Sequence, residues 1–325
     1  MQPGLFPGRR HGSSFPPEIP AWQDLPVIRE SGMTRIGFLV STLLFGLLHS
    51  VSAEPLKVVV SILPQKYFVE RIGGDAVEVE VLVPPGMSPH AYQPQAKQMV
   101  FLSRADLYFR IGVPFENAMM PKIADHFEGR IVDLREGITL IHADAHHHHE
   151  DENGGDADEE EFDPHFWLNP LYAVKLAGRI AETMAVLRPE DQAEFYSRRD
   201  LLIADLLELD EKLSTLLEPF RGKNLLVFHP AWGYFAERYG LHQVAIEHEG
   251  KAPSARYIGE LIRDKDEQAL PLLLVQPQFD HRVAQTIATE LDMEIAQADP
   301  LAEDYLANLE HLATIIAGLS PAVTH

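Results

Sequence analysis

The fold is constrained most by an alternation of strand-length apolar runs with helical segments. This alternation occurs twice, once before and once after a long helical stretch. The first begins with PLKVVVSILP, a continuous apolar run typical of a buried parallel strand that ends in a turn. Strands are also expected at AVEVEVLVPPG and GRIVDLREGI, and QAKQMVFLSRADLYFRIGVPFE is expected to form a helix and a short strand. Strands that alternate with helices predict a parallel α/β sheet.

The same alternation resumes after FRGKN. Strands are expected at NLLVFH, LHQVAIEHE, LPLLLVQPQ and MEIAQADPL, with helices between them and one more after the last strand. We therefore predict an N-terminal α/β lobe at residues 54–188 and a C-terminal α/β lobe at residues 222–325.

A helical segment at residues 189–221 should join the two lobes. Its leucines recur at spacings of three, four and seven, and about 28 residues at 1.5 Å each would extend about 40 Å. A coiled-coil dimer is the alternative, but the repeat covers only about four heptads and carries polar breaks. The pattern therefore favours a monomer.

Charge and cysteine content limit the ligand. The 325 residues carry a formal net charge of −22, with 27 Lys and Arg against 49 Asp and Glu. This balance argues against a nucleic-acid partner, because phosphates are neutralised by clustered Lys and Arg, and it favours a cation. Since there is no cysteine, a transition-metal site must use imidazole and carboxylate, and a lipid anchor on cysteine is excluded.

Residues 1–53 are expected to be a disordered lead and a secretory signal peptide. MTRIGFLVSTLLFGLLHSVSA contains a basic start, an apolar run of about 13 residues and a small-residue cleavage site. A transmembrane anchor is the alternative, but it needs about 20 apolar residues. We predict a secreted protein whose chain starts at Met1 or Met33 and whose mature form begins near Glu54.

Three histidines and one aspartate could bind a metal ion. His90 lies in a proline-rich loop after a strand, His165 lies between a proline and the aromatic run FWL, and His229 ends an apolar strand. Three imidazoles with a fourth place for a carboxylate or water form a zinc arrangement. Asp299 closes the last strand and is the candidate fourth ligand, although it could instead cap a helix. For each histidine alone, a structural role remains the alternative.

Several of these motifs, taken in order, resemble one family. SPHAYQP, ADLYFRIGVPFE, DPHFWLNP, VFHPAWGYF and ADPL resemble the metal-binding proteins of bacterial ABC importers for zinc and manganese, most closely the zinc type called ZnuA. The resemblance spans residues 54 to about 320. It implies two Rossmann-like lobes joined by a rigid linking helix, with a metal held between the lobes by His90, His165, His229 and Asp299. VAIEHEGKAPSARY matches no ligand motif of the family.

Residues 142–163 form a histidine- and acid-rich insertion, with ten Asp or Glu and no Lys or Arg. Zinc-type members resemble this chain in carrying such a loop. We expect it to lack a fixed structure without metal and to collect zinc weakly for the main site, or to sense abundant zinc. An inert acidic spacer is the alternative. The candidate auxiliary ligands are His142, His146, His147, His148 and His149.

The resemblance implies a periplasmic protein that is not an enzyme, captures Zn²⁺ as the transported substrate and delivers it to an inner-membrane ABC permease. Its affinity should fall below about pH 6 as the histidines protonate. One alternative is a manganese-binding protein or adhesin on the same scaffold. Another is a zinc hydrolase, against which the chain shows no HExxH motif and no nucleophile elbow.

Overall fold

The structure is a computed structural model that describes residues 54–123, 127–142, 162–247, 256–259, 269–279 and 281–319. The predicted lead and signal peptide at residues 1–53 lie outside the described residues, and so do His146, His147, His148 and His149. No helix within the described ranges is both long enough and apolar enough to cross a membrane.

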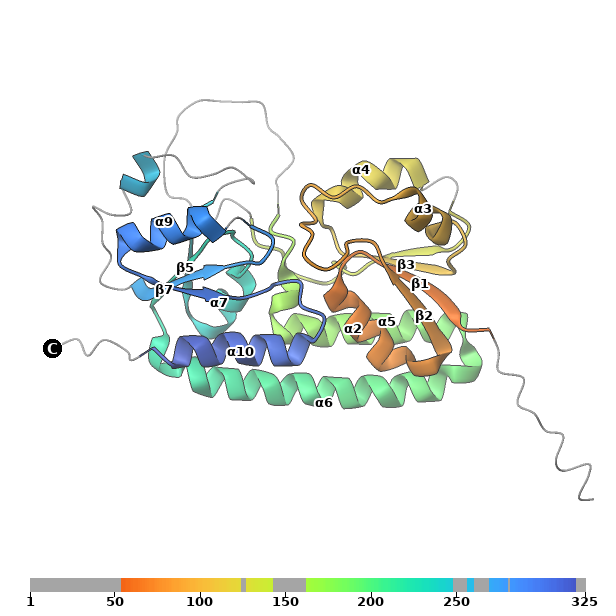
Figure 1. The fold of residues 1–325 in the computed structure, drawn as a ribbon. Coiled ribbons are helices and arrows are strands. Elements are labelled where there is room, and N and C mark those ends of the chain that lie inside the picture. Colours follow the sequence, from red (N-terminus) through yellow and green to blue (C-terminus); the bar gives the residue numbers. More distant parts are fainter. Residues whose placement is uncertain are drawn as a thin grey trace, which may run out of the picture. The chain divides into compact units, whose positions relative to one another are not determined.

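The N-terminal lobe contains a parallel four-stranded sheet of order β2-β1-β3-β4 (Figure 1). Its central strand β1 is buried along almost its whole length, as its continuous apolar sequence predicts. The strands are β1 (Leu56–Val60), β2 (Val77–Val81), β3 (Leu107–Arg110) and β4 (Arg130–Asp133). The helices of this lobe are α2 (Leu63–Gly73), α3 (Ala96–Leu102) and α4 (Pro114–Ile123).

The C-terminal lobe repeats this topology, with a parallel sheet of order β6-β5-β7-β8. The predicted two-lobe α/β fold is therefore confirmed. The strands are β5 (Asn224–Val227), β6 (His242–Ala245), β7 (Ala269–Val275) and β8 (Glu294–Gln297). The helices with fully described bounds are α7 (Gly233–Tyr239), α9 (His281–Leu291) and α10 (Tyr305–Ala317).

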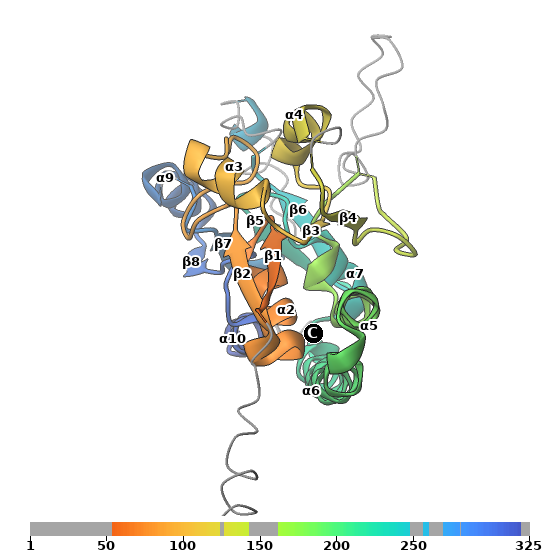
Figure 2. The ribbon, with the colours of Figure 1, turned by 90° about the vertical axis from the view of Figure 1, so that its right-hand side faces the viewer.

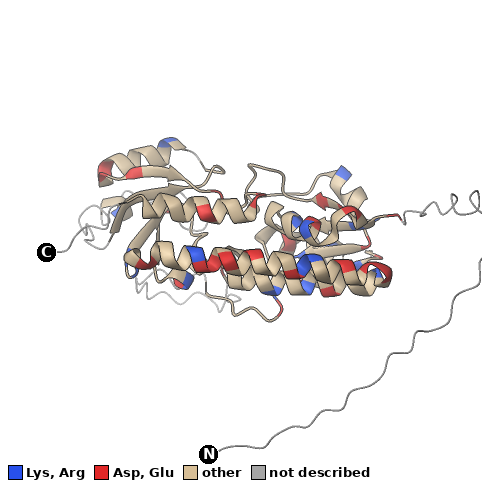
Figure 3. Ribbon diagram, turned by 90° about the horizontal axis from the view of Figure 1, so that it is seen from below, with Lys and Arg blue, Asp and Glu red and all other residues tan. Residues whose placement is uncertain are grey.

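Helix α6 (Gln192–Leu217) joins the lobes and packs against α5 (Pro170–Leu187), α2 and α10 (Figures 1 and 2). Its buried leucines contribute to one apolar core that also includes strands of both sheets, for example Val59, Leu206 and Leu225. Acidic and basic residues are interspersed along the helix (Figure 3). This helix therefore matches the predicted linking helix and supplies part of the core that both lobes share.

Two helices of the N-terminal lobe differ from the sequence-based expectation. The turn predicted at the end of PLKVVVSILP is the first turn of α2, where Pro64 is accommodated because this position needs no intrahelical N–H donor. Helix α4 follows the short strand β3 directly and was not expected, because Pro114 and Pro121 interrupt its pattern.

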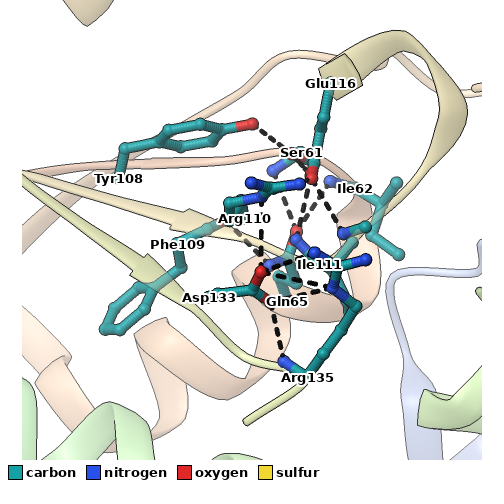
Figure 4. Close-up of polar contacts among 11 residues, drawn as sticks. Ser61, Ile62, Gln65, Tyr108, Phe109, Arg110, Ile111, Glu116, Asp133 and Arg135 are labelled. Carbon is teal, nitrogen blue, oxygen red and sulfur yellow. Dashed lines mark hydrogen bonds and ion pairs between the residues drawn. The ribbon is translucent and has the colours of Figure 1, made fainter. Parts of the chain in front are cut away.

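A buried carboxylate connects the ends of β1 and β3 (Figure 4). Glu116 is fully buried, and its carboxylate accepts hydrogen bonds from the Ser61 hydroxyl and from the main-chain N–H groups of Ile111 and Gly112 at 2.5, 2.9 and 2.8 Å. Arg110 Nε lies 3.3 Å from the same carboxylate. The carboxyl edge of the N-terminal sheet, from which the loop with His90 leaves, is thus held by one polar network.

Candidate metal centre

Three histidines from separate parts of the chain converge. The ligand nitrogens of His90, His165 and His229 all lie within 4.8 Å of one another. The ring centroids of His90 and His229 are 4.7 Å apart, those of His165 and His229 5.5 Å, and those of His90 and His165 6.0 Å. One ion could therefore bridge all three imidazoles after small side-chain rotations.

His165 is buried in the segment that leads into α5. Its Nδ1 lies 2.7 Å from Asp163 Oδ1, and the same oxygen accepts the main-chain N–H of His165 at 2.8 Å. Because Nδ1 donates to the carboxylate, Nε2 is left to bind a metal ion. The adjacent Trp167 donates its indole N–H to the carbonyl of Pro300 at 2.9 Å, which fastens this segment to the C-terminal lobe.

His229 is held on three sides, two residues after strand β5. Its Nδ1 lies 2.6 Å from Glu247 Oε2, and Gln276 accepts from its main-chain N–H at 3.2 Å and donates to its carbonyl at 2.7 Å. Phe279 stacks on the ring at a centroid distance of 5.1 Å. His229 Nε2 is buried without a hydrogen-bond partner among the described residues, as expected of a nitrogen reserved for a metal.

His90 lies on the exposed loop between β2 and α3. The loop is anchored two residues later by Tyr92, whose hydroxyl donates to Gln98 Oε1 at 2.6 Å, while Gln98 Nε2 donates to the carbonyl of Leu82 at the same distance. Tyr92 also packs edge-on against Phe115 at 5.7 Å. The position of His90 therefore depends on the packing of its loop, whereas His165 and His229 each have a carboxylate partner.

The surroundings keep the imidazoles of His229 and His90 neutral. Burial lowers the pKa of His229, although the Glu247 carboxylate acts in the opposite direction. Although its loop is exposed, partial desolvation of the His90 ring, together with repulsion from His229 and His165, lowers the pKa of His90 to about 3. Neutral imidazole is the form that ligates metal, so proton competition begins at a more acidic pH than for ordinary histidines.

The predicted fourth ligand, Asp299, is not a member of the histidine group. Its Oδ1 accepts hydrogen bonds from Gln278 Nε2 at 2.8 Å and from the main-chain N–H of Leu301 at 2.9 Å. In the structure Asp299 Oδ1 stabilises the turn after β8 through these two contacts. Among the described residues, no carboxylate joins the three imidazoles as a direct ligand.

Sequence reasoning did not find the roles of Asp163, Glu247 and Gln276. Glu247 belongs to the segment that matched no ligand motif, and its contact with His229 depends on the pairing of β6 with β5. Asp163 lies two residues before His165, and a carboxylate this close in sequence could have indicated a partner for the imidazole. His142 forms an antiparallel bridge with Phe162 and is not a member of the three-histidine group.

The fold and site define a two-lobed α/β protein with three converging histidines that could hold a metal ion, and comparisons with known proteins agree on the fold and on metal binding. The chain matches the family described as "ZnuA: Zinc-uptake complex component A periplasmic" over residues 58–318. The chain belongs to this family of metal-binding solute-binding proteins.

Relatives and solved structures cover most of the chain. A putative metal-binding protein of Chlamydia muridarum is 31% identical over 85% of this chain and 96% of its own length. The high-affinity zinc uptake system protein ZnuA of Bacillus subtilis is 28% identical, over 73% of this chain and 76% of its own. A crystal structure of ZnuA superposes with a TM-score of 0.74 and 34% identity, covering 82% of this chain and 99% of that one.

Proposed function

We propose that this protein captures Zn²⁺ outside the inner membrane and delivers it to an ABC permease, with His90, His165 and His229 as ligands. The observation that carries the proposal is the convergence of three imidazoles, two of them oriented by buried carboxylates. Neutral imidazole donors suit zinc, whereas manganese prefers carboxylate and water oxygen. Water is the simplest fourth ligand, because no carboxylate among the described residues joins the histidine group.

A binding role agrees better with the site than hydrolysis does. A zinc hydrolase needs a general base beside the metal-bound water. The carboxylates of Asp163 and Glu247 instead contact the Nδ1 atoms of His165 and His229, where they fix the rings. A relative whose structure superposes with a TM-score of 0.72 and 35% identity is described as a ZnuA deletion mutant with zinc bound, which supports zinc as the substrate.

His165→Ala tests the ligand set. We expect this variant to lose tight zinc binding, while His311→Ala, which alters an exposed histidine of α10, should bind zinc like the parent. Elemental analysis of the purified protein, with competition between zinc and manganese, identifies the metal. Tight zinc binding by His165→Ala would refute the ligand set, and preference for manganese would refute zinc as the substrate.

Delivery to a permease requires a separate test in cells. A strain that lacks its own zinc-capture protein should regain growth in zinc-poor medium when it expresses this chain, but not when it expresses His165→Ala. Growth rescue by both proteins would contradict delivery of a metal bound at this centre. Proteolytic mapping of the secreted protein would test the predicted signal peptide and cleavage near Glu54.

The histidine-rich insertion is proposed to supply weaker zinc sites. Because His142 and Phe162 pair as an antiparallel bridge, removal of residues 143–161 leaves two ends that already lie side by side. Calorimetry should then show loss of the weak sites with the tight site unchanged. An unaltered zinc stoichiometry would refute this proposal and support the alternative that the insertion is an inert acidic spacer.

A further inference from the structure

Tyr234 connects the metal centre to the two chain segments that flank the insertion. It lies in α7 of the C-terminal lobe and is fully buried. Its hydroxyl accepts the main-chain N–H of Ile141 at 3.0 Å and donates to the main-chain carbonyl of Asp163 at 2.8 Å. One hydroxyl thus bonds both segments, as an acceptor for the first and as a donor to the second.

These two segments are also bonded to each other. The N–H of Asp163 donates to the carbonyl of Ile141 at 2.9 Å, and His142 pairs with Phe162 in the next position. Tyr234, Ile141 and Asp163 therefore form a closed set of three hydrogen bonds. Each residue takes part in two of these three bonds, all of ordinary length, so a displacement of any one residue would weaken two of them.

The same Asp163 orients a proposed ligand. Its carboxylate contacts both Nδ1 and the main-chain N–H of His165, two residues along the chain. The backbone of Asp163 is fixed by Tyr234 and its side chain fixes His165. Asp163 is 4% exposed, so solvent cannot readily replace a lost protein contact.

We infer that Tyr234 is a positioning residue for the metal centre, acting through Asp163 on the ring of His165. The inference rests on the proposed function. It assigns to the C-terminal lobe a contribution to the orientation of His165, in addition to supplying His229. Loss of the hydroxyl leaves the Ile141 N–H and the Asp163 carbonyl without this partner and lets Asp163 move relative to His165.

Tyr234→Phe removes the hydroxyl and keeps the ring. We expect it to weaken zinc binding about tenfold, measured by competition with a chromophoric chelator, and to speed zinc release to excess chelator. Tyr239→Phe is the matched control, because Tyr239 lies on the same helix and its buried hydroxyl donates to Asp210 at 3.1 Å. This control should bind zinc like the parent, and unchanged affinity in Tyr234→Phe would overturn the inference.

A double-mutant cycle separates positioning from general loosening. If Tyr234 acts through Asp163, Tyr234→Phe should change zinc affinity less than about twofold when Asp163→Ala, which removes the carboxylate acceptor, is already present. A full tenfold effect in that background would overturn the inference. His165→Ala distinguishes the two proposals. Tight zinc binding by His165→Ala would refute the ligand set. If His165→Ala loses tight binding but Tyr234→Phe keeps the affinity of the parent, only the role of Tyr234 is refuted.

Discussion

Each buried histidine of the candidate metal centre, His165 and His229, is paired through Nδ1 with one carboxylate. These pairs fix which nitrogen faces the other imidazoles and increase the electron density on it. The two carboxylates reach their histidines by different routes, since Asp163 is close in sequence and Glu247 is 18 residues from His229. Substitution of the distant carboxylate therefore tests the interaction with little change in the local backbone of the histidine.

Glu247→Gln should weaken zinc binding about tenfold, because the amide can still accept from Nδ1–H but lacks the charge. Glu247→Ala should weaken it further, toward about a hundredfold, because the ring also loses its orientation. Both values are measured by chelator competition. Glu237→Gln, an exposed glutamate of α7, is the control, and equal affinities for Gln and Ala at position 247 would show that orientation contributes nothing.

Burial of His229 should make the metal-free protein sensitive to acid. Its pKa is lowered in the folded state from an ordinary value of 6.5, so below about pH 6.5 the unfolded chain binds a proton that the folded chain excludes. The free energy of unfolding should therefore decrease as the pH falls through this range. The expectation rests on His229 and not on His90, because His90 lies on an exposed loop.

Urea denaturation of the metal-free protein between about pH 7.5 and 5.5 measures this effect. His229→Gln removes the titrating group and should flatten the pH dependence relative to the parent. An equally steep decrease in both proteins would assign the acid sensitivity to other groups.

Secondary-structure elements depend on similar buried polar contacts. Glu116, at the start of α4, is fully buried, and desolvation raises its pKa although Ser61, two main-chain N–H groups and Arg110 favour the charged form. Glu116→Ala should lower the free energy of unfolding by about 3 kcal/mol, because these donors and the Arg110 charge lose their acceptor. Denaturant unfolding gives the value, and Glu128→Ala, at an exposed position, should change little. A loss equal to that of Glu128→Ala would show that the network is not stabilising.

The sequence predicts strands better than short helices in this fold. Buried parallel strands appear as apolar runs, so both sheets were predictable. Helix α2 was not, because its opening Leu63-Pro64 has the pattern of a turn, and α4 contains a proline. The three histidines could be selected from their proline and aromatic neighbours. Their partners Glu247 and Gln276 could not, since those contacts arise only when β5, β6 and β7 pair.

Zinc should stabilise both lobes together, because its proposed ligands come from both and the larger apolar core includes residues of α6 and of both sheets. A ligand that binds only the folded state at 100 times its Kd adds about 2.7 kcal/mol. For a protein of this size that corresponds to a rise of several degrees in the unfolding midpoint. Scanning calorimetry should show one transition that moves up with zinc and returns after chelation. In His165→Ala the shift should disappear, and a zinc-dependent shift of only one of two separate transitions would show that the lobes unfold independently.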